Sequence, residues 1–326
     1  MHGWIILDKP LGLGSTQCVS AVKRALRSGG YAKAKVGHGG TLDPLATGVL
    51  PIAVGEATKL AGRMLDASKV YEFTIRFGVQ TDTLDLEGKV IADSNVRPTI
   101  GQIEAILPRF TGPIAQIPPA YSALKVDGER AYDLARSGAD VVLASRQVTV
   151  HSLLLLKPLP FRGGVGVGPV SLIGTDEHGD SPHPTPPHEG EGLTEITLTA
   201  HVSKGTYIRS LARDIALALG TVGHVTMLRR TKAGPFDLLR AISLDKLAEL
   251  GMSRGLEDKL LPLRAGLDDI PALFLTPDQA GLLRQGRVLI GIAADDGLCF
   301  AMLGDIPVAL AEARDREVRV VRGFNL

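Results

Sequence analysis

An aspartate in a glycine-rich loop is the most unusual feature of this 326-residue sequence. Residues 37–40 read Gly-His-Gly-Gly, and Asp43 follows immediately before Pro44. Because proline restricts the preceding residue to extended backbone, this carboxylate projects from a stiffened loop and not from a helix. Held in this way, a carboxylate can act as a nucleophile or as a general base. A tight turn in which Asp43 caps a backbone amide explains the same residues, and the segment alone does not separate the two interpretations.

Arg209 is the one basic residue whose position suggests a partner for this carboxylate. It follows a Ser-Lys-Gly-Thr turn and falls in the first turn of an expected helix, opposite its apolar stripe. From there a guanidinium can reach a cleft and stabilise an ionised carboxylate. A solvated surface arginine is the alternative. Tyr71 and Tyr207 stand out because aromatic residues make up only 4% of the chain, and each suits either a core or the wall of a binding site.

Metal and hydrolase chemistry find little support in the residues. Cys18 and Cys299 are far apart, so we expect neither a disulfide nor a zinc site, as in a protein of the reducing cytoplasm. His178, His183 and His188 lack a helical scaffold or cysteines nearby that would make them metal ligands. A hydrolase that used the 37–40 loop as an oxyanion site would need a Ser or Cys nucleophile there, and the loop contains neither.

Hydrophobic periodicity predicts the elements that position these residues. We expect strands over 4–7, 49–54, 71–77 and 194–202, and helices from residue 15, over 57–65 and from about 207 to 219. The strict alternation of 71–77 places Tyr71 on the same face as Phe73 and Ile75. No apolar run reaches the roughly 18 residues of a membrane span, so we expect no membrane association.

The chain divides into a large domain, 1–265, and a small C-terminal domain, 266–326. The small domain is predicted from a capped helix at 276–283 and three short strands near 298–303, 306–312 and 317–322. Within the large domain, residues 161–192 are rich in glycine, proline and histidine, and we interpret them as a flexible surface insertion because such a segment buries little apolar surface.

The formal net charge of +1 does not indicate a nucleic-acid partner, but its distribution does. Residues 1–40 carry six Lys and Arg against one Asp, and residues 203–240 carry seven against two, so each segment has a net charge of +5. If the two segments meet in space, they form one basic patch.

Eight motifs together resemble the TruB family of tRNA pseudouridine synthases. The first is GHGGTLDPLATGVLP at 37–51, which resembles the family's catalytic motif. The others occur in the family's order, at residues 8–12, 55–59, 69–71, 81–83, 118–125, 204–210 and 228–231. The resemblance covers about residues 3–262, apart from the insertion.

The resemblance implies a fold and a set of site residues. The fold is α+β, a mixed, largely antiparallel sheet with flanking helices and a central RNA cleft, followed by a small β-rich C-terminal domain that binds RNA in relatives. Asp43 resembles the obligatory aspartate, Arg209 its salt-bridge partner, and Tyr71 the aromatic that stacks on the target uracil. The remaining matches to substrate-contacting positions are His38, Tyr207, Leu228 and Lys59.

The implied reaction converts uridine to pseudouridine, at position 55 of the T-loop of tRNA. It needs no cofactor and no metal, and we expect a cytoplasmic monomer that binds the T-arm of tRNA. The target base must leave its stack, so its pocket needs a stacking face and cationic surroundings. Two alternatives remain open: a non-catalytic protein that binds or folds tRNA, and a synthase for a different RNA uridine.

Overall fold

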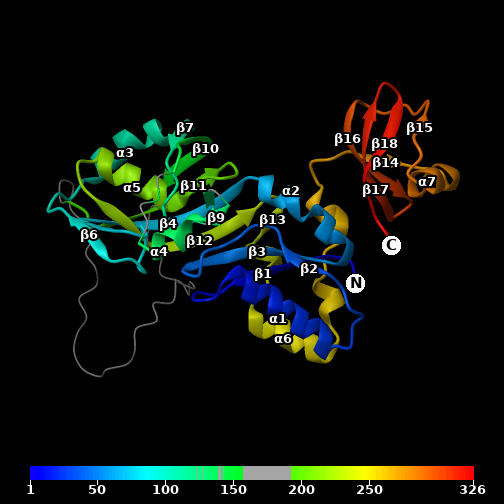
Figure 1. The fold of residues 1–326 in the computed structure, drawn as a ribbon, viewed down its shortest axis with the longest axis horizontal. Coiled ribbons are helices and arrows are strands. Elements are labelled where there is room, and N and C mark those ends of the chain that lie inside the picture. Colours follow the sequence, from blue (N-terminus) through cyan, green and yellow to red (C-terminus); the bar gives the residue numbers. More distant parts are fainter. Residues whose placement is uncertain (123, 127, 139–140, 142, 157–191) are drawn as a thin grey trace, which may run out of the picture.

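A nine-stranded sheet forms the body of the protein in the computed structural model, which describes residues 1–122, 124–126, 128–138, 141, 143–156 and 192–326 (Figure 1). Its strands, in spatial order, are β1 (Gly3–Lys9), β3 (Ala46–Val54), β12 (Gly223–Ala233), β4 (Lys69–Phe77), β11 (Glu195–Val202), β10 (Arg146–Leu155) and β7 (Gly112–Gln116), with β2 (Val36–His38) beside β3 and β13 (Phe236–Asp237) beside β12. Among the described strands of this sheet, only β12 and β3 pair in parallel. The expected mixed, largely antiparallel α+β fold is confirmed.

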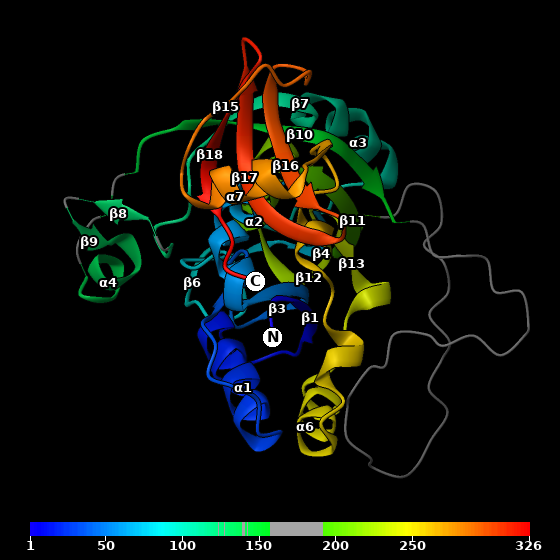
Figure 2. The ribbon, with the colours of Figure 1, turned by 90° about the vertical axis from the view of Figure 1, so that its right-hand side faces the viewer.

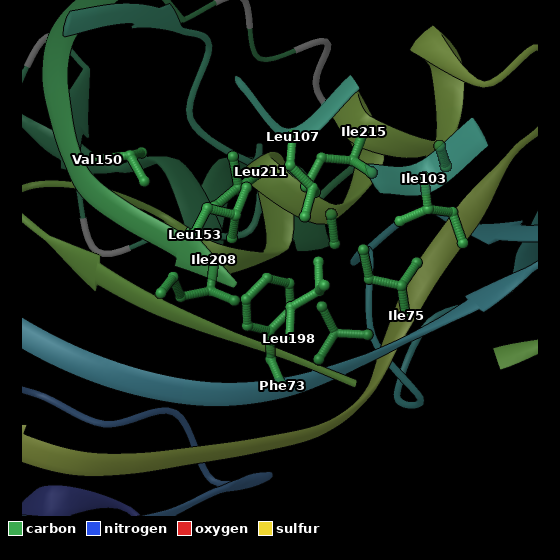
Figure 3. Packing of buried hydrophobic residues seen from close by; sticks show 14 of the residues in the cluster. Phe73, Ile75, Ile103, Leu107, Val150, Leu153, Leu198, Ile208, Leu211 and Ile215 are labelled. Atoms are coloured by element: carbon green, nitrogen blue, oxygen red, sulfur yellow. The ribbon is translucent and has the colours of Figure 1, made fainter. Parts of the chain in front are cut away.

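Two groups of helices cover one face of this sheet, one on each half. The helices α1 (Ser15–Ser28) and α6 (Leu244–Ser253) cover β1 and β3, and lie side by side in both views (Figures 1 and 2). On the other half lie α5 (Ile208–Ala218), α3 (Ile100–Ile106) and the 3-10 turn η2 (Leu107–Phe110). Each group of helices covers an apolar core of its own. Figure 3 shows the core under α5, where Phe73 and Leu198 of the sheet meet Leu211 of α5.

The boundary between these two cores positions the site. Tyr71 on β4 and Leu228 on β12 are the residues that pack against both clusters. The sheet is continuous across this boundary, because β12 pairs with β3 on one side and with β4 on the other. Side chains on this face, between the two helix groups, therefore line a cleft whose base is the continuous sheet.

The opposite face, at the β1 end, is covered by the chain that follows β3 and by the C-terminal region. The predicted helix over 57–65 is in fact a 3-10 turn, η1 (Gly55–Leu60), followed by a short helix, α2 (Ala61–Asp66). The C-terminal sheet has the order β14 (Ala272–Phe274), β16 (Gly297–Leu303), β17 (Ile306–Arg314), β18 (Glu317–Gly323) and β15 (Leu289–Ile290), with α7 (Pro277–Arg284) against it. The three strands predicted near 298, 306 and 317 are confirmed. The short strands β14 and β15 were not predicted, because two or three residues are too few to show the alternation of polar and apolar residues that indicates a strand.

One apolar cluster crosses the predicted boundary at residue 265. Trp4 of β1, fully buried, shares it with Phe300 and Phe324 of the C-terminal region. The segment at the predicted boundary also contacts Trp4, since the indole of Trp4 donates a hydrogen bond to the carbonyl of Leu263 at 3.3 Å. The C-terminal sheet is therefore packed onto the large sheet and not merely tethered to it.

Smaller elements complete the fold. They are β5 (Val79–Thr81) with β6 (Val90–Asp93), β8 (Lys125–Val126) with β9 (Glu129–Arg130), α4 (Ala131–Arg136), η3 (Leu238–Arg240), η4 (Leu256–Lys259) and η5 (Leu263–Gly266). Of the predicted insertion at 161–192, all but its last residue lies outside the described residues, and so do its three histidines. No helix among the described residues is both long enough and apolar enough to cross a membrane.

Candidate active site

Asp43 lies in the loop that joins β2 to β3, and buried polar groups hold that loop on one side. Ser15, at the start of α1, exchanges two hydrogen bonds with the backbone of Leu42, its hydroxyl donating at 3.1 Å and accepting at 2.8 Å. The ammonium of Lys9, fully buried, donates to the carbonyl of Pro44 at 3.2 Å. The loop is therefore fixed immediately before and immediately after Asp43.

Arg230 holds the same loop from the sheet side. It is 1% exposed, and its guanidinium donates to the carbonyls of Gly40 at 3.2 Å, Thr41 at 3.3 Å and Val49 at 2.8 Å. Its backbone lies opposite Gly48 in the parallel β12–β3 pair. A Cβ at Gly48, where φ is +101°, would overlap the backbone of Arg230, so only glycine allows this approach.

Arg209 connects Asp43 to a second aspartate. It is 7% exposed, in the first turn of α5, and its guanidinium forms ion pairs with Asp43 at 2.9 Å and with Asp85 at 3.2 Å. It also donates to the carbonyls of Thr83 at 2.9 Å and Tyr121 at 3.0 Å. With four acceptors around it, the guanidinium has little freedom to move, and it stabilises the negative charge of the half-exposed Asp43 carboxylate.

Asp85 is the site residue that our reading of the sequence missed. Its buried carboxylate accepts the Thr83 hydroxyl and the amide of Glu87 at 3.0 Å, in addition to Arg209. In the sequence, residues 81–85 are a polar segment that follows the expected strand 71–77 and predicts only a turn. Its two threonines and two aspartates were a signal of a hydrogen-bonded structure, but nothing local to the turn indicated Arg209, 124 residues away, as the partner.

A cleft of about 680 Å³ opens over these groups. Five of the predicted residues line it: Asp43, Tyr71, Tyr207, Arg209 and Leu228. The structure brings them together from β4, β12, α5 and the loop before β3. The ring of Tyr207 is backed by the guanidinium of Arg146, whose Cζ lies 4.8 Å from the ring centroid.

His38 and Lys59 do not line this cleft. His38 lies on β2, where burial and the charge of Arg230 lower the pKa of its imidazole, and its buried Nδ1 has no hydrogen-bond partner among the described residues. Lys59 lies on η1, where its ammonium contacts Glu56 at 2.7 Å and the carbonyl of Gly323 at 2.8 Å. Lys59 is thus placed against the C-terminal tail and not beside Asp43.

Several bases of the two basic segments are structural. Lys9, Arg209 and Arg230 are buried, and their donors are directed at protein carbonyls and carboxylates. Such groups raise the positive potential of the cleft without touching a phosphate. Lys69, on the cleft wall, contacts the carbonyls of Leu65 and Ala67, both at 2.6 Å; burial, aided by Arg230, lowers its pKa to about 8.

The catalytic possibilities of this arrangement are limited. The described residues contain no group of three or more His, Cys, Asp or Glu side chains that could hold a metal ion. What the cleft offers is one oriented carboxylate with an exposed face, a cation behind it, and an apolar and aromatic wall. Such a set suits attack by, or proton transfer to, a carboxylate beside a flat, uncharged ring.

Comparison with known proteins identifies the family. Residues 27–160 match the profile of the TruB family pseudouridylate synthase N-terminal domain, and residues 209–268 that of the tRNA pseudouridylate synthase B C-terminal domain. A tRNA pseudouridine synthase B of Novosphingobium aromaticivorans is 62% identical, covering 100% of this chain and 98% of its own, and that of Zymomonas mobilis is 54% identical, covering 100% and 96%.

Solved structures share the fold. A chain in the crystal structure of a Cbf5-Nop10-Gar1 complex is 25% identical and aligns with a TM-score of 0.68, over 99% of this chain and 84% of that one. A chain in the structure of an H/ACA RNP bound to a substrate RNA containing 2'-deoxyuridine aligns with the same TM-score at 23% identity, over 99% and 85%. On its matches over the full length, this chain belongs to the TruB family of tRNA pseudouridine synthases, isomerases that convert uridine in tRNA to pseudouridine.

Proposed function

We propose that this protein isomerises uridine 55 in the T-loop of tRNA, with Asp43 as the catalytic carboxylate. The observation that carries the proposal is the ion pair between Asp43 and Arg209 at 2.9 Å, in a cleft that also holds Tyr71. The names of the relatives support tRNA as the substrate. Position 55 and the T-arm rest on the resemblance of residues 37–51 to the family's catalytic motif.

The reaction is balanced without any external group. The bond from N1 of uracil to C1′ of the ribose breaks, the base turns, and a bond forms between C5 and C1′. The C5 proton then leaves to solvent, and N1 takes up a proton, so the product is an isomer of uridine. Asp43 enters in one of two ways: its carboxylate attacks C1′ and is later displaced by C5, or it removes a proton from C2′ to give a glycal and then returns it. Both routes need an ionised carboxylate, which Arg209 stabilises.

The cleft walls serve to hold a base that has left its stack, which costs a few kcal/mol. Tyr71 offers a ring face for uracil, and Leu228 offers an apolar surface next to it. Tyr207 stands at the start of α5, two residues before Arg209, with Arg146 behind its ring. We assign Tyr71, Tyr207 and Leu228 to binding of the target nucleotide, and Arg209 to orientation of Asp43.

We also propose that the protein acts as a monomer in the cytoplasm and that its C-terminal domain contacts tRNA. Both cysteines are free and buried, which fits a reducing compartment. His38, away from the cleft lining, and Lys59, on the C-terminal tail, are not assigned a direct contact with the flipped base.

Asp43→Asn tests the catalytic assignment, because it keeps the shape of the side chain and removes the charge. We expect pseudouridine formation to disappear while the Kd for tRNA changes by no more than a few-fold, since phosphate contacts dominate affinity. Single-turnover tritium release from tRNA labelled at C5 of uridine measures the first quantity, and filter binding measures the second.

The matched control is Asp66→Asn, which removes an exposed carboxylate that is also paired with a cation at 2.9 Å, that of Lys204. This variant should keep the wild-type rate. If Asp43→Asn retained a substantial fraction of the wild-type rate, with an unchanged thermal melt, Asp43 would be a structural cap and the mechanism would be wrong.

A further inference from the structure

The end of the chain lies on η1, the turn that follows β3. The ammonium of Lys59 donates to the carbonyl of Gly323 at 2.8 Å, and the amide of Asn325 donates to the carboxylate of Glu56 at 2.8 Å. Glu56 and Lys59 are themselves paired at 2.7 Å. One ion pair on the large domain thus holds two successive backbone groups of the tail, one on each side of Phe324.

Phe324 is the apolar part of the same contact. It is 4% exposed, and its ring meets that of Phe300 edge to face at 5.9 Å between centroids. Both belong to the cluster that contains Trp4 of β1. The polar contacts of Glu56 and Lys59 therefore flank a buried aromatic residue that joins the two domains, an arrangement that fixes the tail in both position and direction.

The turn that carries this pair is fixed from its other side by the start of the chain. The amide of Glu56 donates to Nδ1 of His2 at 3.1 Å. At Gly55, where φ is +61°, a Cβ would meet the carbonyl of Met1 and the ring of His2 at 2.5 Å, so the turn and the N-terminus are closely packed. Both views show the two ends of the chain near each other (Figures 1 and 2).

A second contact holds the C-terminal domain where the chain enters it. One guanidinium nitrogen of Arg63, in α2, donates to both carboxylate oxygens of Asp269, at 2.9 and 3.2 Å.

The charge of Glu56 suits its contact with the tail. Burial by itself would raise the pKa of Glu56, but hydrogen bonds from Lys59 and from the amide of Asn325 outweigh it, and the pKa is lowered. The carboxylate is therefore ionised at neutral pH, as the contact requires.

We propose that the Glu56–Lys59 pair is the docking site for this chain's own C-terminal tail, and that the docked tail fixes the C-terminal domain relative to the cleft. Glu56 and Lys59 are then positioning residues for tRNA binding, which they influence through the domain. This consequence rests on the proposed contact between the C-terminal domain and tRNA, whereas the docking itself does not.

The rival explanation is that Lys59 binds an RNA phosphate directly. Its side chain is only 31% exposed and already contacts a carboxylate and a carbonyl. The two explanations differ in a double-mutant cycle with the tail. If Lys59 acts through the tail, Lys59→Met should cost nothing further once residues 323–326, which include its partner carbonyl, are removed. A direct phosphate contact would cost the same in both backgrounds.

Hydrogen–deuterium exchange without RNA tests the docking alone. In Lys59→Met we expect the amide of Asn325 to exchange roughly tenfold faster, as the loss of a hydrogen bond to or from a charged group implies. Lys35→Met is the matched control, because Lys35 is exposed and only its backbone carbonyl contacts the turn, accepting from the amide of Gly55 at 2.8 Å. Unchanged exchange at residues 323–326 in Lys59→Met would overturn the proposal.

Binding and turnover test the consequence. We expect Lys59→Met to raise the Kd for tRNA by roughly three- to tenfold, about the value of one net hydrogen bond, and to leave the single-turnover rate at saturating tRNA within about twofold. An increase in Kd that persists undiminished after removal of residues 323–326 would refute action through the tail. Failure of the proposed function would appear separately, as absent turnover in the wild type.

Discussion

Two buried arginines hold the region around Asp43, and they differ in their hydrogen-bond and ion-pair partners. Arg209 contacts two carboxylates, those of Asp43 and Asp85, in addition to two carbonyls. The acceptors of Arg230 are three backbone carbonyls of the loop and of β3. The charge of Arg209 is thus offset by its two carboxylate partners. The charge of Arg230 acts on its neighbours: the pKa values of Lys9, His38 and Lys69 are lowered mainly by burial, and the charge of Arg230 lowers them further.

The difference separates two tasks that an active site needs. A guanidinium between carboxylates sets the orientation and charge of the reacting group, which affects the transition state. A guanidinium among carbonyls satisfies buried acceptors that would otherwise be costly, and so fixes the shape of the loop. If this division is correct, equivalent substitutions at the two positions have different consequences.

Arg209→Met should cause the largest loss of rate. The carboxylates of Asp43 and Asp85 would lose their shared cation, and loss of one such electrostatic partner at a reacting centre lowers the rate by about a hundredfold to a thousandfold. We expect the single-turnover rate to fall by at least about a hundredfold. Arg213→Met, which removes an arginine of the same helix that pairs with Asp214, should remain near the wild-type rate. A comparable loss in both variants would indicate damage to α5 instead.

Arg230→Met should act mainly on stability. It leaves three carbonyls of the loop region without their donor, at a cost of about 1–3 kcal/mol for each that stays unsatisfied. We expect a fall in Tm of several degrees, measured by thermal melts in the absence of RNA, and a single-turnover rate at saturating tRNA much closer to the wild type than that of Arg209→Met. If Arg230→Met lost as much rate as Arg209→Met in the fraction that stays folded, the two roles would not be separate.

The sequence predicted the parts of this site that depend on local structure. Tyr71 could be placed because alternation along a strand assigns each residue to a face, and Asp43 because Pro44 limits its backbone. The roles of Lys9 and Arg230 could not be inferred, because the sequence shows them only as two of the bases in residues 1–40 and 203–240. Only tertiary contacts show that they bind loop carbonyls. The partner of Lys59 lies 264 residues away, beyond the reach of any sequence pattern.

Asp85 was missed for a related reason. Its turn includes Leu84 with a φ of 63°, a conformation that side chains other than glycine rarely adopt and that nothing in the sequence announces. The turn becomes part of the site because it lies beside α5, where Arg209 pairs with Asp85 as well as with Asp43. The proposed role of Asp43 therefore involves this turn too.

Asp85→Asn should have an intermediate effect, because it keeps a hydrogen-bond acceptor for Arg209 and removes one charge. Hydrogen bonds to charged groups contribute about 1.5–3 kcal/mol, so we expect a rate loss of roughly ten- to a hundredfold at saturating tRNA. Asp82→Asn is the control, as Asp82 belongs to the same turn and accepts the hydroxyl of Tyr121 at 3.3 Å. Equal losses in the two variants would assign the effect to the turn and not to the contact with Arg209.

Lys69 gives the smallest expected effect, and it tests whether the uncompensated charge of Arg230 matters for RNA. Burial and then Arg230 lower the pKa of Lys69 to about 8, with Asp66 opposing and Lys204 adding to the shift. Wild-type protein should therefore lose one cleft cation between pH 7 and 9, and the Kd for tRNA should rise a few-fold over that range by filter binding.

Stability should move in the opposite direction. Because the pKa of Lys69 in the folded protein lies below the ordinary lysine value of 10.5, the unfolded chain binds the proton more tightly. The free energy of unfolding therefore rises as the pH increases from about 8 towards 10.5. Lys69→Met removes both trends, while Lys204→Met, at an exposed position, should keep them. Identical pH dependence of tRNA affinity in wild type and Lys69→Met would mean that this ammonium does not face the RNA, and that Arg230 affects only the geometry of the loop.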